Sequence, residues 1–372
     1  MELPRQQKIV FDHLSALVKN GMRQGDLLPT VSSLTKTLSV SRMTIVKVLA
    51  LMESMDILYT KLGKGTFAGS RAVAEKKVLP YFHYVPVPPG KKPVITFLSP
   101  FRHNDPFMKE FTLGVENGID PDKYELVKQH LWYGNSPEEK IIKDAAKNSS
   151  GIILISPQTQ KMQDLISELV RKNYPIVLLD QWPKNLVCNS VSADNEDAIF
   201  KGMEYLYDLG HRKITFATQK KDNSSVASRI NAYCLFMKKK KLSWQVVVAE
   251  KELMKIVQNS DRSRRPTAVF AYCDAYASVL ARKFAKAGIR VPEDISVIGF
   301  DDNPLAQKKS LQLTTLQQPK YKIGLKAALL IQEIMEEKLE QRVCRRYFIG
   351  CNLIVRESVQ APEKVSSVKK KN

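Results

Sequence analysis

Apolar residues follow two different patterns on either side of residue 93. Before it, they recur at the spacing of an α-helix, in two runs that flank a short polar corner near Val40. After it, short continuous apolar runs such as Val94–Leu98 and Gly151–Ile155 alternate with stretches long enough for a helix. The sequence therefore predicts a small helical domain followed by a larger α/β domain.

Residues 28 to 49 read as two short helices around a tight corner. Thr30 and Ser41 can cap them, because each hydroxyl can accept a backbone N–H of the first turn. Leu34 and Leu38 mark the buried side of the first helix. The apolar residues of the second helix also fall on one side: Ile45, Val48, Leu49 and Met52. A helix-turn-helix is predicted, covered by an earlier helix with the stripe Ile9, His13, Leu14, Leu17 and Val18.

The opposite side of the second helix carries Met43, Val46, Lys47 and Ala50, with Arg42 at its start. Such a face suits a DNA major groove, where apolar side chains contact thymine methyl groups. The alternative is the solvated basic face of any small helical domain. Two β-prone runs around the tip Gly63-Lys64-Gly65 follow, and they favour DNA binding because they predict a hairpin wing.

Residues 5 to 69 resemble the winged helix-turn-helix of the GntR family of bacterial transcription factors. The match rests on Gly21, Gly25, Leu28-Pro29, Leu34, Leu38, Val40-Ser41-Arg42, Thr44, Ile45 and Gly63-Lys64-Gly65-Thr66-Phe67. The resemblance implies double-stranded operator DNA as a partner and these DNA-binding residues: Ser32, Ser41, Arg42, Met43, Thr44, Val46, Lys47, Lys64, Gly65 and Thr66. Ser32 and Val46 stand where the family usually has arginine, so we expect an operator other than the family's commonest one.

Five prolines between Arg71 and Pro93 predict an extended linker (Pro80, Pro86, Pro88, Pro89 and Pro93). The strands expected beyond it are Val94–Leu98, Gly151–Ile155, Ile176–Leu179, Lys213–Ala217, Ala268–Ala271 and Ile295–Gly299. Continuous apolar strands separated by amphipathic helices predict parallel sheet buried on both faces. Polar residues such as Ser156 follow the strands, and ligands of open α/β sheets bind at the carboxyl ends of strands, so we expect a binding cleft there.

A second resemblance covers residues 93 to 358. Its segments, in order, are Val191-Ser192-Ala193-Asp194-Asn195, Leu209-Gly210-His211-Arg212-Lys213-Ile214, Arg229, Pro266 to Ala271, Val291 to Asp302, Leu313-Thr314-Thr315 and Leu353 to Ser358. They look like the effector domain of LacI-type regulators, which is related to periplasmic sugar-binding proteins. The implied fold class is α/β, an N-terminal winged helix-turn-helix plus a two-lobed periplasmic-binding-protein-like domain with parallel sheets.

The two resemblances also imply domain boundaries. We expect a winged domain at 1–70, a linker at 71–92, an effector domain at 93–358 and a disordered basic tail at 359–372. Within the effector domain, lobe 1 is expected to hold 93–191 and 319–344, and lobe 2 to hold 192–318 and 345–358. The family's fold implies three chain crossings between the lobes and closure by hinge motion.

The effector site is carried over from the LacI-type domain position by position. Arg229 matches an arginine that binds sugar hydroxyls, Asp274 the aspartate of an Asn-Asp pair, and Asp301 the first aspartate of a Phe-Asp-Asp turn. Cys273 replaces the usual asparagine, which removes a donor and an acceptor. The expected effector-binding residues are Phe107, Asp180, Trp182, Asp194, Arg229, Cys273, Asp274, Asp301 and Gln318. Phe107, Trp182 and, outside this set, Trp132 and Tyr272 are candidate platforms for the apolar face of a sugar ring; the alternative is ordinary core or rim packing, which is favoured for Tyr272. A helix N-cap is an equally open interpretation of Asp194 and Asp274, since each directly precedes a predicted helix.

Composition narrows the class of protein. The chain has 372 residues, 44% of them hydrophobic, which is enough apolar material for two or three folded units. A formal charge of +20 favours a polyanionic partner. Residues 1 to 77 contribute only +6 of it, from 12 basic and 6 acidic residues. The basic runs at 238–241 and 262–265 are interpreted as solvated surface.

Motif searches favour a reduced, metal-free protein inside the cell. No apolar run approaches the ~20 residues that cross a bilayer, so we expect a soluble cytoplasmic protein. Five cysteines without a Cys-x-x-Cys pair fit reduced thiols, and five histidines form no His-Glu-x-x-His pattern. No cofactor is expected. The sequence also contains no Gly-x-Gly-x-x-Gly, P-loop or Gly-x-Ser-x-Gly, which disfavours an enzyme.

The predicted function is that of a sequence-specific transcriptional regulator working as a homodimer on a pseudo-palindromic operator. We expect a repressor of carbohydrate-utilisation genes, controlled by a neutral monosaccharide or derivative in the interlobe cleft. A sugar-responsive activator remains open, because the sequence does not give the sign of the response. An α/β enzyme acting on a sugar and a general DNA binder without sequence preference are the disfavoured alternatives.

Overall fold

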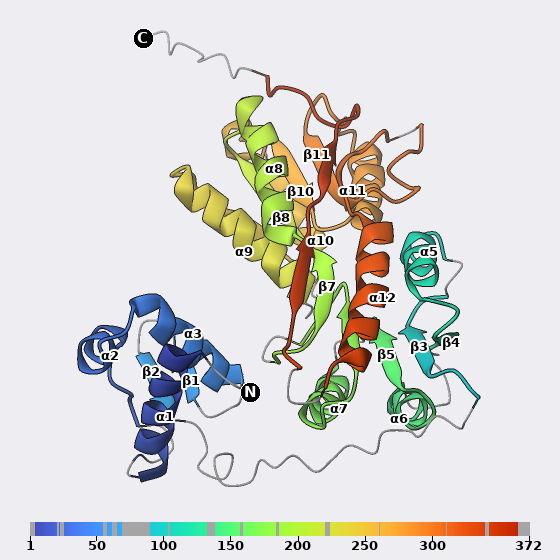
Figure 1. Cartoon of the computed structure of the whole chain (residues 1–372). Coiled ribbons are helices and arrows are strands. Elements are labelled where there is room, and N and C mark those ends of the chain that lie inside the picture. The colour runs from blue at the N-terminus through green and yellow to red at the C-terminus, as the bar shows by residue number, and fades with distance from the viewer. Residues whose placement is uncertain are drawn as a thin grey trace. The chain divides into compact units, whose positions relative to one another are not determined.

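The computed structural model describes residues 4–20, 22, 26–54, 58–61, 65–68, 90–102, 105–131, 138–156, 159–183, 186–219, 224–259, 261–309, 311–338 and 342–363. They form two compact units, an N-terminal unit and a larger C-terminal unit, each described by itself below (Figure 1).

The N-terminal unit is three helices followed by a β-hairpin. Its elements are α1 (Arg5–Asn20), α2 (Val31–Leu38), α3 (Arg42–Ser54), β1 (Leu58–Lys61) and β2 (Gly65–Ala68). The Thr30 hydroxyl accepts a hydrogen bond from Ser33 N at 3.2 Å, and the Ser41 hydroxyl accepts one from Thr44 N at 3.1 Å. Both predicted caps, and with them the predicted helix-turn-helix, are therefore confirmed.

One hydrophobic core holds the N-terminal unit together. It contains Val10, Leu14, Val18, Leu28, Leu34, Val40, Ile45, Val48, Leu49, Met52, Leu58 and Ala68. The buried side predicted for α3 is confirmed by Ile45, Val48, Leu49 and Met52. The expected stripe on α1 was wrong at one position, because Ile9 is 45% exposed and Val10 is buried instead. Val10, Leu14 and Val18 recur at four-residue intervals and so share one helix face, whereas Ile9 lies about 100° around the helix from Val10.

The predicted wing is an antiparallel hairpin. Leu58 pairs with Ala68 and Lys61 with Gly65. Gly65 has a φ of +109°, a conformation that side chains with a Cβ rarely adopt, so glycine is required at this end of the turn. Leu28 N donates to Thr66 O at 2.8 Å, which ties the hairpin to the segment before α2.

The C-terminal unit is built on two sheets. In the first, the strand order is β13-β7-β6-β5-β3-β4 and all pairs are parallel. In the second, the order is β14-β12-β11-β10-β8-β9, and only the β12–β14 pair is antiparallel. The strands are β3 (Val94–Ser99), β4 (Glu125–His130), β5 (Gly151–Leu154), β6 (Ile176–Leu179), β7 (Ser190–Ala193), β8 (Ile214–Ala217), β9 (Gln245–Val247), β10 (Ala268–Ala271), β11 (Ser296–Asp301), β12 (Thr314–Gln317), β13 (Arg346–Ile349) and β14 (Asn352–Ile354).

Helices cover both sheets. They are α5 (Lys109–Gly118), α6 (Glu138–Asn148), α7 (Gln160–Arg171), α8 (Asn195–Asp208), α9 (Ser224–Lys239), α10 (Glu250–Val257), α11 (Asp274–Lys286) and α12 (Lys320–Glu336), with a 3₁₀ turn at Arg262–Arg264. α12 packs against β5, β6 and β7, and α8 against β12 and β14. None of these helices, within the described part of the chain, is long and apolar enough to cross a membrane.

All six predicted strands are present, within one or two residues of their expected ends. The six strands that the apolar pattern missed are β4, β7, β9, β12, β13 and β14. β4 illustrates why: its sequence Glu-Leu-Val-Lys-Gln-His lies at a sheet edge, where four of its six side chains are exposed. An edge strand needs no continuous apolar run, so its pattern does not stand out.

The chain crosses between the two sheets at positions that differ from the expected lobe boundaries. Residues 345–358 were assigned to lobe 2, but β13 pairs in parallel with β7, with Arg346 opposite Ser190, and therefore belongs to the first sheet. β14 then joins the second sheet. Likewise, β7 continues the first sheet past residue 191 as far as Ala193. β13 belongs to the first sheet because, without it, the side of β7 that faces away from β6 would be an unpaired sheet edge.

The closest helix packing in the C-terminal unit joins α5 to α12. A Cβ built on Gly114 would meet Tyr321 O at 2.1 Å, and one built on Gly324 would meet Phe111 O at 2.2 Å. Each glycine therefore lies directly against a backbone carbonyl of the other helix, and a side chain at either position would force the two helices apart.

This packing predicts that Gly114→Ala lowers the free energy of unfolding of the C-terminal unit by roughly 1–3 kcal/mol, because the helices must separate. Gly350→Ala is the matched control, since a Cβ there meets nothing within 4 Å. Urea unfolding of the full chain, followed by near-ultraviolet circular dichroism, measures both. Equal stability of the two variants would contradict the close approach.

Candidate functional site

Side chains from both sheets meet in one group, which we call the interlobe cluster: Asp180, Arg229, Asp301, Gln318 and Lys320. Asp180 follows β6 of the first sheet, and Asp301 ends β11 of the second. Arg229 comes from α9, Gln318 follows β12, and Lys320 begins α12. Each of the five is at most 8% exposed. Asp180, Asp301 and Gln318 lie at the carboxyl ends of strands, which is where ligands of open α/β sheets bind.

Arg229 is held by groups of its own lobe. Its Nε donates to Asn195 Oδ1 at 2.7 Å and its Nη1 to Tyr272 O at 2.7 Å. The guanidinium carbon lies 3.5 Å from the centre of the Phe300 ring, and Nη1 lies 4.0 Å from Asp301 Oδ1. A buried guanidinium needs such partners, because an unpaired charge in the interior is strongly unfavourable.

Asp301 lies between the arginine and two further donors. Gln318 Nε2 donates to its Oδ1 at 2.7 Å, and Lys320 Nζ donates to its carbonyl oxygen at 2.6 Å. Its φ of +115° is strained for a residue with a Cβ, at a cost of about 1–3 kcal/mol. Burial raises the pKa of Asp301 to about 6, opposed by Arg229 and Lys320.

Two oxygen atoms of the interlobe cluster are buried without a hydrogen-bond partner among the described residues: Asp180 Oδ1 and Gln318 Oε1. Asp180 also has a positive φ, of +68°, and its carbonyl accepts from Ser225 Oγ of α9 at 2.7 Å. Burial raises the pKa of Asp180, opposed by Arg229. Unmade hydrogen bonds of buried acceptors cost about 1–3 kcal/mol each, so donors from a ligand would be stabilising here.

Lys320 is the residue of this cluster that the sequence reasoning missed. It is 4% exposed, and its ammonium lies 5.4 Å from the centre of the Phe107 ring. The available signal was weak: a lysine at the first position of a helix, directly after Gln317-Gln318-Pro319. A lysine is so often solvated that this position alone could not indicate burial.

The expected aromatic platforms lie at different distances from the cluster. Phe107 contacts Lys320, whereas the Trp182 ring meets Phe348 edge-on at 6.0 Å and lies 5.6 Å from the Arg346 guanidinium. Trp182 N also donates to Ser224 Oγ at 2.9 Å. Trp132, a further candidate, lies outside the described residues.

Two predicted site residues, Asp194 and Asp274, have structural partners. Asp194 is the N-cap of α8 and accepts from Asp197 N at 3.0 Å. Asp274 is fully buried, and its two oxygens accept from the Thr315 hydroxyl at 2.6 Å and from Asn303 N at 2.9 Å. Burial and the neighbouring Asp301 raise the pKa of Asp274 well above its ordinary value. Cys273 is half-buried, and burial raises its pKa to about 11.

The turn that carries Asp301 is anchored on three sides. Asp274 holds Asn303, as described above. Asp302 accepts from Arg356 Nη2 at 2.7 Å and from Gln317 Nε2 at 2.9 Å. These bonds hold the strained Asp301 in place, which makes Asp274 and Asp302 positioning residues for the cluster.

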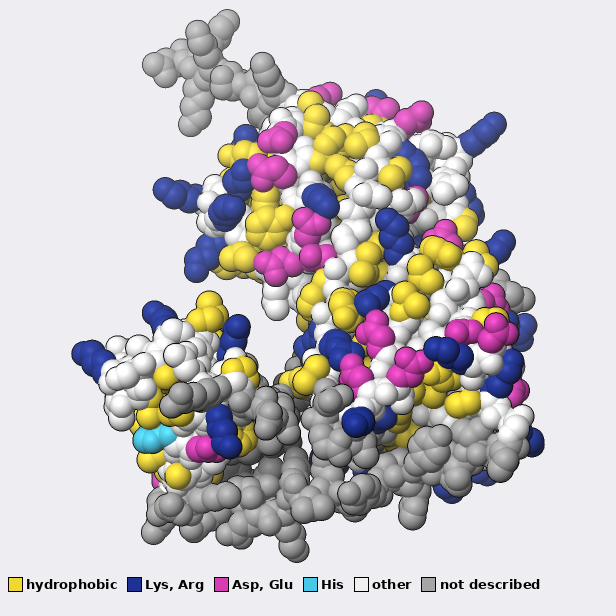
Figure 2. All heavy atoms as spheres, in the orientation of Figure 1, with side chains coloured by type: hydrophobic (Ala, Val, Ile, Leu, Met, Phe, Trp, Pro, Cys, Tyr) yellow, Lys and Arg dark blue, Asp and Glu magenta, His cyan; other side chains and the backbone are white. Residues whose placement is uncertain are grey.

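Six of the ten predicted DNA-binding residues are exposed on the helix-turn-helix: Ser32, Ser41, Arg42, Met43, Val46 and Lys47. Gly65 is also exposed, Thr44 and Thr66 are half-buried, and Lys64 lies outside the described residues. Met43 and Val46 are 64% and 45% exposed, although both are apolar. On the face shown in Figure 2, Lys and Arg side chains of the C-terminal unit are interspersed with Asp and Glu.

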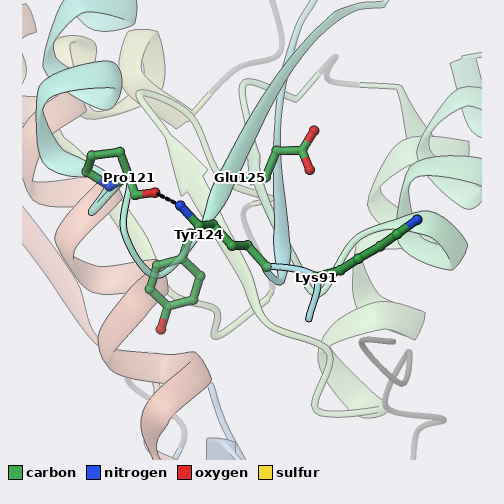
Figure 3. Close-up of a pocket in the computed structure, with 5 residues that line it drawn as sticks. Lys91, Pro121, Tyr124 and Glu125 are labelled. Atoms are coloured by element: carbon green, nitrogen blue, oxygen red, sulfur yellow. Dashed lines mark hydrogen bonds between the residues drawn. The ribbon is translucent and has the colours of Figure 1, made fainter. Parts of the chain in front are cut away.

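Two cavities lie away from the interlobe cluster. One, of about 460 Å³, is lined by Lys91, Lys92, Pro121, Tyr124 and Glu125 (Figure 3). It lies where β3 and β4 begin, at the end of the strands opposite to their carboxyl ends, and Lys92 Nζ donates to Pro121 O at 2.5 Å. The other, of about 700 Å³, follows α11 and includes Arg282 and Lys308.

Comparisons with known proteins agree with this architecture. Residues 6–68 match the family described as bacterial regulatory proteins, gntR family, and residues 203–359 match a periplasmic binding protein-like domain. The chain is 28% identical over 270 residues to the HTH-type transcriptional repressor PurR of Photobacterium profundum, covering 70% of this chain and 79% of the relative. It is 28% identical over 265 residues to the repressor CytR of Escherichia coli, covering 69% and 76%.

Solved structures share the fold of the C-terminal unit. A LacI family transcriptional regulator of Enterococcus faecium with bound ribose is 21% identical, with a TM-score of 0.59 over 72% of this chain and 99% of its own. The Lac repressor dimer bound to operator is 20% identical, with a TM-score of 0.61 over 73% and 96%.

Fold and matches together define the class: the chain is a DNA-binding transcription regulator. It joins a helix-turn-helix domain that matches the gntR family to a domain that matches the periplasmic binding protein-like family.

Asp301→Asn tests the electrostatics of the cluster. Because the folded-state pKa of about 6 lies above the ordinary 3.8, protonation of Asp301 stabilises the folded chain, and this contribution is lost as the pH rises through 6. The variant carries no ionisable group there. We therefore compare the difference in free energy of unfolding, variant minus wild type, at two pH values. This difference should be more positive at pH 8 than at pH 4.5, by on the order of 2 kcal/mol. A pH-independent difference in denaturant titrations would contradict the raised pKa.

Arg42→Ala tests the exposed face of α3. We expect weaker binding to duplex DNA and a slope of log affinity against log salt that is smaller by about 1, because one phosphate contact is lost. Lys8→Ala removes the same charge from the exposed side of α1 and is the matched control. Fluorescence anisotropy at several salt concentrations measures both. If Lys8→Ala had the larger effect, α3 would not be the reading helix.

Proposed function

We propose that this regulator is a repressor of carbohydrate-utilisation genes, whose affinity for operator DNA is set by a neutral monosaccharide or derivative bound at the interlobe cluster. The sequence relatives named as repressors support the sign of the response. The match of residues 6–68 to the gntR family supports operator DNA as the partner. The chain would act in the cytoplasm, where its DNA lies.

The observation that carries the effector site is a pair of buried oxygens that have no hydrogen-bond partner among the described residues, Asp180 Oδ1 and Gln318 Oε1. Both are acceptors, so they call for a ligand that presents hydrogen-bond donors, as the hydroxyl groups of a sugar do. They come from segments that follow β6 and β12, which lie in different sheets. One ligand that reached both oxygens would therefore link the two lobes.

The charges of the cluster favour a neutral ligand. Asp180 and Asp301 supply two acidic groups, and Arg229 and Lys320 supply two basic groups, so the four balance without a charged effector. An added phosphate would have to be buried beside two carboxylates, which is costly. The Enterococcus faecium regulator of the same fold has bound ribose, which makes D-ribose the natural first probe.

In the proposed mechanism, the effector changes how the two lobes close, and the change alters the spacing of two winged domains in a homodimer. The ligand can shift operator affinity only through its different affinity for the two lobe arrangements. An effector that strengthened operator binding would instead make the chain a sugar-responsive activator or a co-repressed regulator. We also propose that the chain acts by binding alone, so a bound sugar would be recovered chemically unchanged.

Asp180→Asn tests the effector site. A thermal-shift screen of D-ribose, other pentoses, hexoses, deoxyhexoses and their phosphates first identifies the sugar that raises the melting temperature of wild type. We expect Asp180→Asn to weaken the affinity for that sugar at least about tenfold, because a charge-assisted hydrogen bond contributes roughly 1.5–3 kcal/mol. Operator affinity without sugar should stay at the wild-type value.

The matched control is Asp194→Asn, which changes the same charge but preserves an N-cap, since asparagine caps helices as well as aspartate does. Isothermal titration calorimetry measures sugar affinity, and anisotropy measures binding to an operator selected from random duplex DNA. Equal sugar affinity in wild type and Asp180→Asn would place the effector elsewhere. Operator binding that no bound sugar alters would refute the coupling itself.

A further inference from the structure

Two of the five cysteines lie just before two neighbouring strands. In the parallel pair of β7 and β13, Arg346 is opposite Ser190. Cys188 and Cys344 each stand two residues before the first pair of this register, so the same register, continued beyond the strands, would bring them opposite each other. Neighbouring strands lie about 4.8 Å apart, and the Cα atoms of disulfide-bonded cysteines are usually about 4.4–6.8 Å apart. The spacing of these two segments is therefore compatible with a disulfide.

Hydrogen bonds hold the two segments side by side just before the strands begin. Ser190 N donates to Arg345 O at 3.0 Å, and Arg345 N donates to Asn189 Oδ1 at 2.8 Å. The Cys344 Sγ contacts Val187 O at 3.6 Å, so its thiol points toward the segment that carries Cys188. These bonds join residues within two positions of the cysteines, so the two segments lie side by side where the thiols are.

The two thiols share one electrostatic environment. Burial raises the pKa of Cys188 to about 12, opposed by the guanidinium of Arg346, and the neighbouring Cys344 raises it further. Burial also raises the pKa of Cys344, again opposed by Arg346. The thiols therefore respond to each other and to the same cation, which requires that both lie close to it.

The two cysteines differ in solvent exposure. Cys344 is an exposed residue, whereas Cys188 is fully buried. Cys344 is therefore the cysteine of the two that a bulky oxidant would meet first. Cys234 is half-buried in α9 of the second lobe, so it offers a comparison within the same chain.

We propose that Cys188 and Cys344 are a redox modification site, which closes to a reversible disulfide on exposure to a low-molecular-weight disulfide such as oxidised glutathione. Cys344 would be the attacking thiol and Cys188 the resolving thiol. The proposal does not depend on the identity of the effector or of the operator.

The chemistry takes two exchange steps. The Cys344 thiolate attacks one sulfur of oxidised glutathione, the glutathione S–S bond breaks, and one glutathione thiolate leaves and takes up a proton. The Cys188 thiolate then attacks Cys344 Sγ in this mixed disulfide, and the second glutathione leaves. Two protein thiols are oxidised by two electrons, and one oxidised glutathione is reduced to two molecules of glutathione.

The position of the pair gives the modification a consequence for the fold. β7 leads from the first sheet into α8, which packs against β12 and β14 of the second sheet. β13 leads from the first sheet directly into β14 of the second. A disulfide just before β7 and β13 would therefore restrict the relative movement of two of the segments that connect the lobes. Arg346 also lies 5.6 Å from the Trp182 ring, so tryptophan fluorescence should report the change.

The test incubates the full chain in glutathione buffers of increasing oxidised fraction, followed by acid quench, alkylation and mass spectrometry. We expect wild type to lose two of its five thiols, with a mass lower by two hydrogens and one peptide pair joined through Cys188 and Cys344. Because both thiols have raised pKa values, the rate should rise roughly tenfold per pH unit near neutrality. The oxidised chain should melt about 5 °C or more above the reduced chain, reversibly, because the crosslink closes a long loop.

Three variants separate the roles of the thiols. Cys188→Ser should accumulate one glutathione adduct on Cys344, because the resolving thiol is missing. Cys344→Ser should keep Cys188 reduced, because the buried thiol is not reached. Cys234→Ser is the matched control and should form the crosslink at the wild-type rate.

Five unmodified thiols in wild type, a crosslink between two chains through Cys344, or a stable adduct on Cys344 of wild type would each overturn the proposal. So would crosslinking that leaves the melting temperature of the chain unchanged.

Discussion

A guanidinium buried between two sheets is the interaction on which the C-terminal unit depends most. Arg229 is 4% exposed, and its charge is tolerated only because Asn195, Tyr272 and Asp301 surround it. Those three residues come from the start of α8, the end of β10 and the end of β11, so one side chain sets the spacing of three elements. The same arrangement places the positive charge beside Asp180 of the first lobe. The packing of these three elements and the proposed binding of an effector therefore both depend on the charge of Arg229.

The cluster around this arginine stores unfavourable energy that a ligand could relieve. Asp301 is held at a φ of +115° by Lys320 and Gln318, and Asp180 and Gln318 each keep a buried oxygen without a partner in the described part of the chain. Strain and unmade hydrogen bonds cluster at functional sites, because the surrounding structure is stable enough to hold them. Asp274 and Asp302 provide that support, since their hydrogen bonds fix the turn between β11 and β12. Neither needs to touch an effector to matter for its binding.

The strands that join the two lobes carry a second set of chemical groups. Cys188, Cys344 and Arg346 lie beside one another because β7 and β13 pair, and the Trp182 ring lies near the same arginine. Effector and redox state would thus act on neighbouring parts of one structure, from the carboxyl end of β6 and from the start of β7. Ser225 of α9 donates to the carbonyl of Asp180, so even the segment after β6 is tied to the opposite lobe. Effector binding after β6 and disulfide formation before β7 would therefore both act close to the segments that connect the two lobes.

The sequence by itself determined the helix-turn-helix with both caps, the hairpin wing and six strands with continuous apolar runs. These features are local, or follow from a period that a few neighbouring residues reveal. Tertiary structure alone decided that Lys320 is buried, that Asp274 pairs with Thr315, that β13 belongs to the first sheet, and that the segment of Cys344 lies beside the segment of Cys188. Each of these depends on a partner far away in the chain, 19 residues from Lys320 to Asp301 and 41 from Asp274 to Thr315. Local pattern carries no information about such a partner, because the contact exists only once both sheets have formed.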